Sequence, residues 1–128
     1  MGVTAVEISV RFRRGEVALF LARRVVANAL AESGCLVDPD VAVLLMDELT
    51  ANAERHAGGA LEVSVQVGGT RVWVEVQDAD PRAPVLREPG ALDEGGRGLW
   101  LVDHLATAWG VRPLAGDRKA VWFEVRAD

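Results

Sequence analysis

The chain has 128 residues, of which 50% are hydrophobic and 26% are charged, and its formal net charge is -5. These values predict one folded domain over residues 1–128, exclude a disordered chain, and argue against direct binding of nucleic acid. The single cysteine, Cys35, cannot form an internal disulfide, and no apolar run has the roughly 18 residues that a membrane span needs. We therefore expect a cytoplasmic protein that does not bind a membrane.

The N-terminal part of the chain predicts a strand followed by a helix. Apolar and polar residues alternate over residues 3–12, as in a strand with one buried face. From Glu16 to Ser33 the apolar residues recur at the spacing of one helical face. Gly34 follows directly, at the position where a glycine in the left-handed conformation ends many helices.

A second helix is predicted to begin at Asp38 and Pro39, because aspartate is a preferred N-cap residue and proline is favoured at the first helical position. It should end at the glycine pair that follows residue 57. Its expected apolar stripe consists of Val41, Leu44, Leu45, Leu49 and Ala53.

Glu48, Asn52 and His56 are spaced one turn apart within this stripe. Burying an unpaired polar group costs roughly 2–7 kcal/mol, so either a satisfied core network or a ligand should face these side chains. We favour a ligand site, because a carboxylate and an amide oxygen one turn apart can hold Mg²⁺ or its waters, and the carboxylate can accept a proton.

Two alternating apolar runs, residues 61–67 and 72–76, flank Gly68-Gly69-Thr70 and predict an antiparallel hairpin. Asp78 follows the second run, where a carboxylate can accept a hydrogen bond from an exocyclic amine such as that of adenine, or can cap a turn. Residues 78–94 contain three prolines and have no periodicity, which predicts a long loop. Loops of this length in compact domains are usually functional.

The segment Gly95-Gly96-Arg97-Gly98 precedes a third helical pattern, which runs over residues 99–106 and should stop near Gly110. Glycines permit close backbone approach and a helix N-terminus attracts anions, although a hinge or tight turn is the alternative interpretation of the segment alone. Residues 119–126 alternate like a final strand. The order of elements predicts an α+β fold, a two-layer sandwich with helices on one face of a mixed, mostly antiparallel sheet.

In this order, the segments DELTANAERHA, VQDADPRAP and GGRGLWLVDHLATAWGV resemble the N box and the two glycine-box regions of the ATP-binding domain shared by histidine kinases, gyrase and Hsp90, the Bergerat fold. With the terminal KAVWFEV, the resemblance covers nearly the whole chain and points to the anti-sigma-factor serine/threonine kinases, particularly their actinobacterial relatives. It implies an enzyme that transfers the γ-phosphoryl group of Mg·ATP to a serine of an anti-sigma-factor antagonist and sequesters a sigma factor. A homodimer is compatible with the resemblance.

The resemblance also implies roles for individual residues. Glu48 would be the general base, Asn52 the Mg²⁺ ligand and Asp78 the adenine contact. Arg97 would stabilise the γ-phosphate, and His56 would close the N box by packing. The residues that the resemblance places around the phosphates are Gly96, Arg97, Gly98 and Leu99.

Two positions depart from the family pattern. Ala120 occupies the place just before the final Val-Trp where relatives usually have a threonine that supports the adenine-contacting aspartate, and Asp80 lies where relatives often have serine. A missing hydrogen bond would weaken nucleotide binding by about 1 kcal/mol. The alternative function is therefore a non-catalytic nucleotide-binding or partner-sequestering module of the same fold, although the intact pair of Glu48 and Asn52 argues for catalysis.

Overall fold

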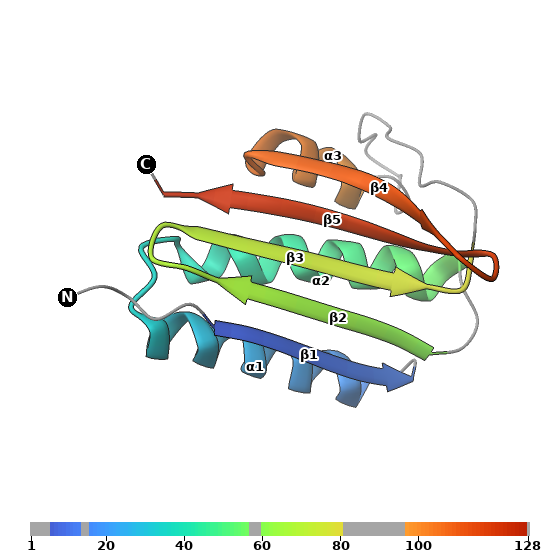
Figure 1. The fold of residues 1–128 in the computed structure, drawn as a ribbon, viewed down its shortest axis with the longest axis horizontal. Coiled ribbons are helices and arrows are strands. Elements are labelled where there is room, and N and C mark those ends of the chain that lie inside the picture. The colour runs from blue at the N-terminus through green and yellow to red at the C-terminus, as the bar shows by residue number, and fades with distance from the viewer. Residues whose placement is uncertain (1–5, 14–15, 57–59, 81–96, 128) are drawn as a thin grey trace.

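The computed structural model describes residues 6–13, 16–56, 60–80 and 97–127. These residues form two layers, a five-stranded sheet and three helices that lie on one face of it (Figure 1). The strands are β1 (Val6–Arg13), β2 (Ala60–Val67), β3 (Arg71–Asp78), β4 (Ala108–Leu114) and β5 (Arg118–Arg126). The helices are α1 (Glu16–Ser33), α2 (Pro39–His56) and α3 (Arg97–Leu105). This is the α+β sandwich that the sequence predicts.

The sheet has the strand order β1-β2-β3-β5-β4, and every pairing between these strands is antiparallel. β2 and β3 form the predicted hairpin. The pairing of β3 with β5 places Asp78 opposite Lys119 and Gln77 opposite Ala120. Because side chains alternate between the two faces of a sheet, Asp78 and Lys119 share the face that packs against the helices, whereas Gln77 and Ala120 belong to the other face.

Strand β4 is a difference from the sequence prediction, which continued the third helix toward Gly110. Helix α3 ends at Leu105 instead, and the Thr107 N–H donates to the Glu124 carbonyl of β5 at 2.7 Å, which directs the chain into the sheet. β4 is an edge strand with mostly exposed side chains, so it lacks the alternation that identifies a strand in a sequence. Gly110 is needed within it, since a Cβ there would lie 2.9 Å from atoms of the Trp122 indole.

The ends of α1 and α2 follow the predicted signals. Gly34 has a φ of 69°, the left-handed conformation expected after the last residue of α1. At the start of α2, the Asp38 carboxylate accepts a hydrogen bond from the Asp40 N–H at 2.9 Å. This bond satisfies one of the donors that the first helical turn leaves free. No helix in the described part of the chain is long and apolar enough to span a membrane.

The core lies between the sheet and the helices, and it sets the rotation of α2 about its axis. The buried apolar residues of α2 are Ala42, Leu45, Met46, Leu49 and Ala53. Leu44, which the sequence prediction placed in this stripe, is 39% exposed. Burying one large aliphatic side chain stabilises the fold by about 1.5–3 kcal/mol. The buried stripe therefore holds α2 in one orientation, with Glu48 and Asn52 at the margin of the core.

Candidate functional site

The residues of the predicted site come from α2, β3 and α3. Glu48 and Asn52 lie in the second half of α2, Asp78 is the last residue of β3, and Gly98 belongs to the first turn of α3. Helix α2 contacts both β3 and α3. The C-terminal ends of α2 and β3 lie toward the same end of the molecule (Figure 1). The fold thus gathers three segments that are far apart in the sequence.

Glu48 lies directly against the first turn of α3. A Cβ on Gly98 would be 2.6 Å from Glu48 Oε2 and 3.0 Å from Glu48 Cβ, both closer than real Cβ atoms normally approach. Gly98 is buried, so the helix backbone and the carboxylate share a closely packed contact. A glycine is needed here because of this contact. The glycine segment and the N box, which the sequence analysis treated as separate motifs, meet at these two residues.

Glu48 and Asn52 are both half-buried, which differs from the prediction that they point into the core. Neither side chain forms a hydrogen bond with another described residue. Among the described residues, no buried side-chain nitrogen or oxygen lacks a hydrogen-bond partner. The carboxylate and the amide therefore remain open to solvent, and they have oxygen atoms available for a ligand.

Asp78 lies at the end of β3 and forms a buried ion pair with Lys119 of β5. Asp78 Oδ1 is 3.0 Å from Lys119 Nζ, and the two side chains are only 2% and 4% exposed. The same Oδ1 atom accepts a hydrogen bond from the Asp80 N–H at 2.8 Å. Lys119 Nζ also donates to the Asp80 carbonyl at 2.9 Å. The three residues form a closed set of contacts at the end of the sheet.

Lys119 supports Asp78, whereas the sequence predicted that this support is missing because position 120 is an alanine. Ala120 pairs with Gln77 and belongs to the opposite face of the sheet. A shift of one residue along a strand moves a side chain to the other face. The alternation of β5 contained the correct signal, because Lys119 has the same parity as the buried residues Val121 and Phe123.

Other predicted site residues are described only in part. Leu99 lies in the first turn of α3, and its side chain is 4% exposed and belongs to the core. Arg97 and His56 lie in α3 and α2, but their side chains are outside the described residues. Gly96 and most of the predicted loop over residues 78–94 also lie outside them.

The described residues contain no group of three or more histidine, cysteine, aspartate or glutamate side chains that could hold a metal ion. Glu48 and Asn52 can offer two oxygen ligands one helical turn apart. Mg²⁺ prefers oxygen ligands and commonly combines one or two protein ligands with phosphate oxygens and water. The donor atoms therefore fit a magnesium ion that arrives with a phosphate ligand.

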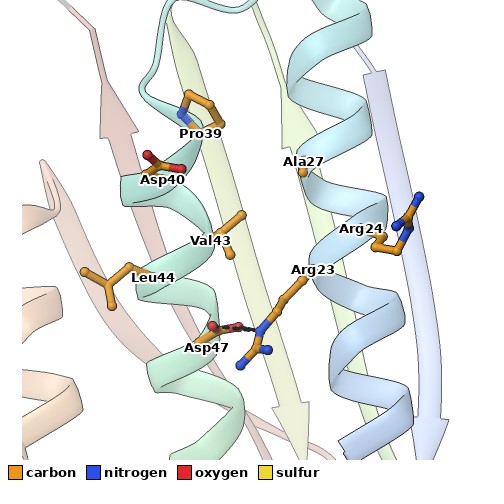
Figure 2. A pocket seen from close by; sticks show the side chains of 8 residues that line it. All are labelled: Arg23, Arg24, Ala27, Pro39, Asp40, Val43, Leu44 and Asp47. Atoms are coloured by element: carbon orange, nitrogen blue, oxygen red, sulfur yellow. Dashed lines mark hydrogen bonds and ion pairs between the residues drawn. The ribbon is translucent and has the colours of Figure 1, made fainter.

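A separate groove of about 470 Å³ lies between α1 and α2 (Figure 2). Arg23 of α1 forms an ion pair across the groove with Asp47 of α2, and Arg23 Nε lies 2.8 Å from Asp47 Oδ1. The hydrogen bond that Arg23 Nε donates to the Asp47 carboxylate is the main cause that raises the pKa of the Arg23 guanidinium. Asp47 precedes Glu48 in the helix, but it faces α1 and Glu48 faces α3. The groove contains none of the predicted site residues.

Comparison with known proteins identifies the family. Residues 13–124 match the model of the histidine kinase-like ATPase domain. The chain is also 41% identical over 86 residues to the uncharacterised protein SCO4941 of Streptomyces coelicolor, an alignment that covers 62% of this chain and 79% of that protein. The chain therefore belongs to the family of histidine kinase-like ATPase domains.

Proposed function

We propose that the chain is an ATP-binding serine/threonine protein kinase of the anti-sigma-factor type. It transfers the γ-phosphoryl group of Mg·ATP to a serine of an antagonist protein and sequesters a sigma factor, and so regulates transcription. Family membership supports ATP as the nucleotide. The resemblance of the motifs to those of anti-sigma-factor kinases supports the choice of acceptor and partner.

The contact between Glu48 and Gly98 is the observation that carries this proposal. The N-terminus of a helix binds phosphate through its free N–H groups and its dipole, and glycine lets the backbone approach closely. A carboxylate against the same turn lies where an attacking hydroxyl could lose its proton. Glu48 then acts as the general base, and Arg97 and Gly96 complete the phosphate contacts. Such a base contributes typically 10²–10⁴-fold to a rate.

The remaining roles follow from the same arrangement. Asn52, one turn after Glu48, contributes an oxygen to Mg²⁺, which neutralises charge on the phosphates when it is bound. Asp78 accepts a hydrogen bond from the base of the nucleotide at the end of β3. The two residues hold opposite ends of the ligand.

The test is a phosphorylation assay with the antagonist protein that co-purifies with the tagged chain in Mg·ATP. With γ-labelled ATP, we expect label on a serine of that protein. Glu48→Gln should keep its affinity for Mg·ATP within about threefold and lower the labelling rate by about 10²–10⁴-fold. Asp47→Asn is the matched control, because Asp47 faces α1 and should not affect labelling. Labelling by Glu48→Gln at the wild-type rate would exclude Glu48 as the base.

The second candidate is a module that binds nucleotide or partner without catalysis. The contacts of Asp78 Oδ1 with Lys119 and with the Asp80 N–H favour this candidate, because they leave the carboxylate fewer free acceptor positions for the nucleotide base. In this case, the wild-type chain would label no protein, and partner binding would persist in Glu48→Gln. The assay therefore separates the two functions.

A further inference from the structure

The pair of Asp78 and Lys119 retains hydrogen-bonding capacity. An ammonium group has three N–H donors. Lys119 Nζ uses two of them, in hydrogen bonds to Asp78 Oδ1 and to the Asp80 carbonyl. Both bonds that the Asp78 carboxylate accepts from described residues go to Oδ1. No buried side-chain oxygen of the described residues lacks a partner, so Oδ2 is not sealed from solvent. One N–H donor and one carboxylate oxygen therefore lie next to each other with capacity to spare.

This combination differs chemically from an aspartate alone. An ionised carboxylate only accepts hydrogen bonds, so by itself it suits the 6-amino group of adenine and repels the 6-carbonyl oxygen of hypoxanthine or guanine. An ammonium only donates, so it suits that carbonyl oxygen. On adenine the pair can bind the 6-amino group and N1. On a 6-oxopurine the pair can bind the carbonyl oxygen and the N1–H.

We propose that Lys119 is a specificity-determining residue that lets this site bind 6-oxopurine nucleotides about as well as ATP. The inference rests on the proposed function, because it takes Asp78 as the contact for the base. What it adds is a role for Lys119 in base recognition, and Lys119 is buried on the same face of the sheet as Asp78. A lysine that merely holds the sheet together would affect all nucleotides equally.

Inosine triphosphate is the appropriate probe, because its base differs from adenine only in having a 6-carbonyl group and an N1–H. Isothermal titration calorimetry should give the wild-type protein dissociation constants for Mg·ITP and Mg·ATP that agree within about tenfold. In Lys119→Met the carbonyl oxygen faces a carboxylate with no ammonium beside it. The ratio of the ITP constant to the ATP constant should then rise by about tenfold or more, the effect of losing one charge-assisted hydrogen bond.

Arg112→Met is the matched control. Arg112 of β4 pairs with the buried Glu75 of β3 across the intervening strand β5, on the face of the sheet that is opposite to Asp78. This variant should leave the ITP to ATP ratio unchanged. If it changes the ratio as much as Lys119→Met does, the effect is a general loss of stability and the inference is wrong.

The outcomes separate the inference from the function on which it depends. Wild-type protein that binds ATP but discriminates against ITP by a hundredfold or more would overturn the role of Lys119 and leave the ATP site intact. Equal weakening of ATP and ITP binding by Lys119→Met would also overturn the role of Lys119 and leave the ATP site intact. Absence of binding for both nucleotides would overturn the proposed function itself. If Lys119→Met does not fold, the wild-type comparison alone still decides.

Discussion

Glu48 and Gly98 are coupled at the level of single atoms, because the carboxylate occupies the space that any larger residue at position 98 would need. Gly98→Ala would normally favour a helix by about 0.5–1 kcal/mol. Here the added methyl would meet Oε2 at 2.6 Å and Cβ at 3.0 Å, and the second atom cannot move aside by a side-chain rotation. Overpacking of this kind costs typically about 1–3 kcal/mol. We expect Gly98→Ala to lower the free energy of unfolding by about 1 kcal/mol in urea titrations.

The control for this substitution is Gly68→Ala in the β2–β3 hairpin. A Cβ at Gly68 would meet its nearest neighbour, the Arg71 carbonyl oxygen, at 3.8 Å, which is an ordinary contact. Its effect on stability should be clearly smaller. A Gly98→Ala variant that is as stable as the wild type would show that Glu48 does not pack closely against α3.

Between elements, the ion pair of Asp78 and Lys119 connects β3 and β5 in a nearly dry environment. Removing one partner of a buried pair leaves an uncompensated charge and typically destabilises a protein by about 3–5 kcal/mol. We expect a loss of this size in urea unfolding for Lys119→Met. The double variant Asp78→Asn/Lys119→Met should recover much of it, because neither charge remains.

An exposed ion pair between two strands serves as the comparison for the buried pair of Asp78 and Lys119. Arg11 and Glu62 bridge β1 and β2 at 2.7 Å, but the arginine side chain is 72% exposed. Solvent screens such a pair, so Arg11→Ala should cost no more than about 1 kcal/mol. Equal losses for Arg11→Ala and Lys119→Met would mean that the pair of Asp78 and Lys119 is accessible to water.

Elements with strong local signals could be predicted from the sequence. Asp38 and Pro39 mark the start of α2, Gly34 marks the end of α1, and the glycines after Val67 mark the hairpin, because each is a local backbone preference. β4 could not be predicted in this way, since it is an edge strand defined by its pairing with β5.

The same limit applies to the candidate site. Glu48 and Asn52 stood out in the sequence because they are polar residues at helical spacing in an apolar segment. Their contact with Gly98 depends on how α2 and α3 pack, and the partner of Asp78 depends on the register of β3 and β5. The support for Asp78 was expected at position 120, one residue away from Lys119 in that register. Tertiary pairing, not local propensity, determines these contacts.

For the whole molecule, the two layers have to remain stable although none of the three described helices covers the second face of the sheet (Figure 1). Side chains of neighbouring strands cover that face themselves. Arg71 and Arg126 both pair with Glu124, at 3.0 and 2.7 Å, and the rings of Trp73 and Trp122 stack with centroids 6.4 Å apart. This leaves the helical face for the nucleotide site that we propose between α2, α3 and the end of β3.

A ligand held by three elements should stabilise the whole fold, because it binds the native state and not the unfolded chain. At a concentration of one hundred dissociation constants, Mg·ATP should add about 2.7 kcal/mol, or about 10 °C in Tm for a domain of this size. Asn52→Ala should bind ATP with little dependence on Mg²⁺, so that EDTA reduces the Tm shift of the wild type but hardly changes that of the variant. Differential scanning calorimetry with and without EDTA measures both effects. An equal response of the two proteins to EDTA would show that Asn52 does not hold the ion, and the oxygen ligands would then have to come from elsewhere in the chain.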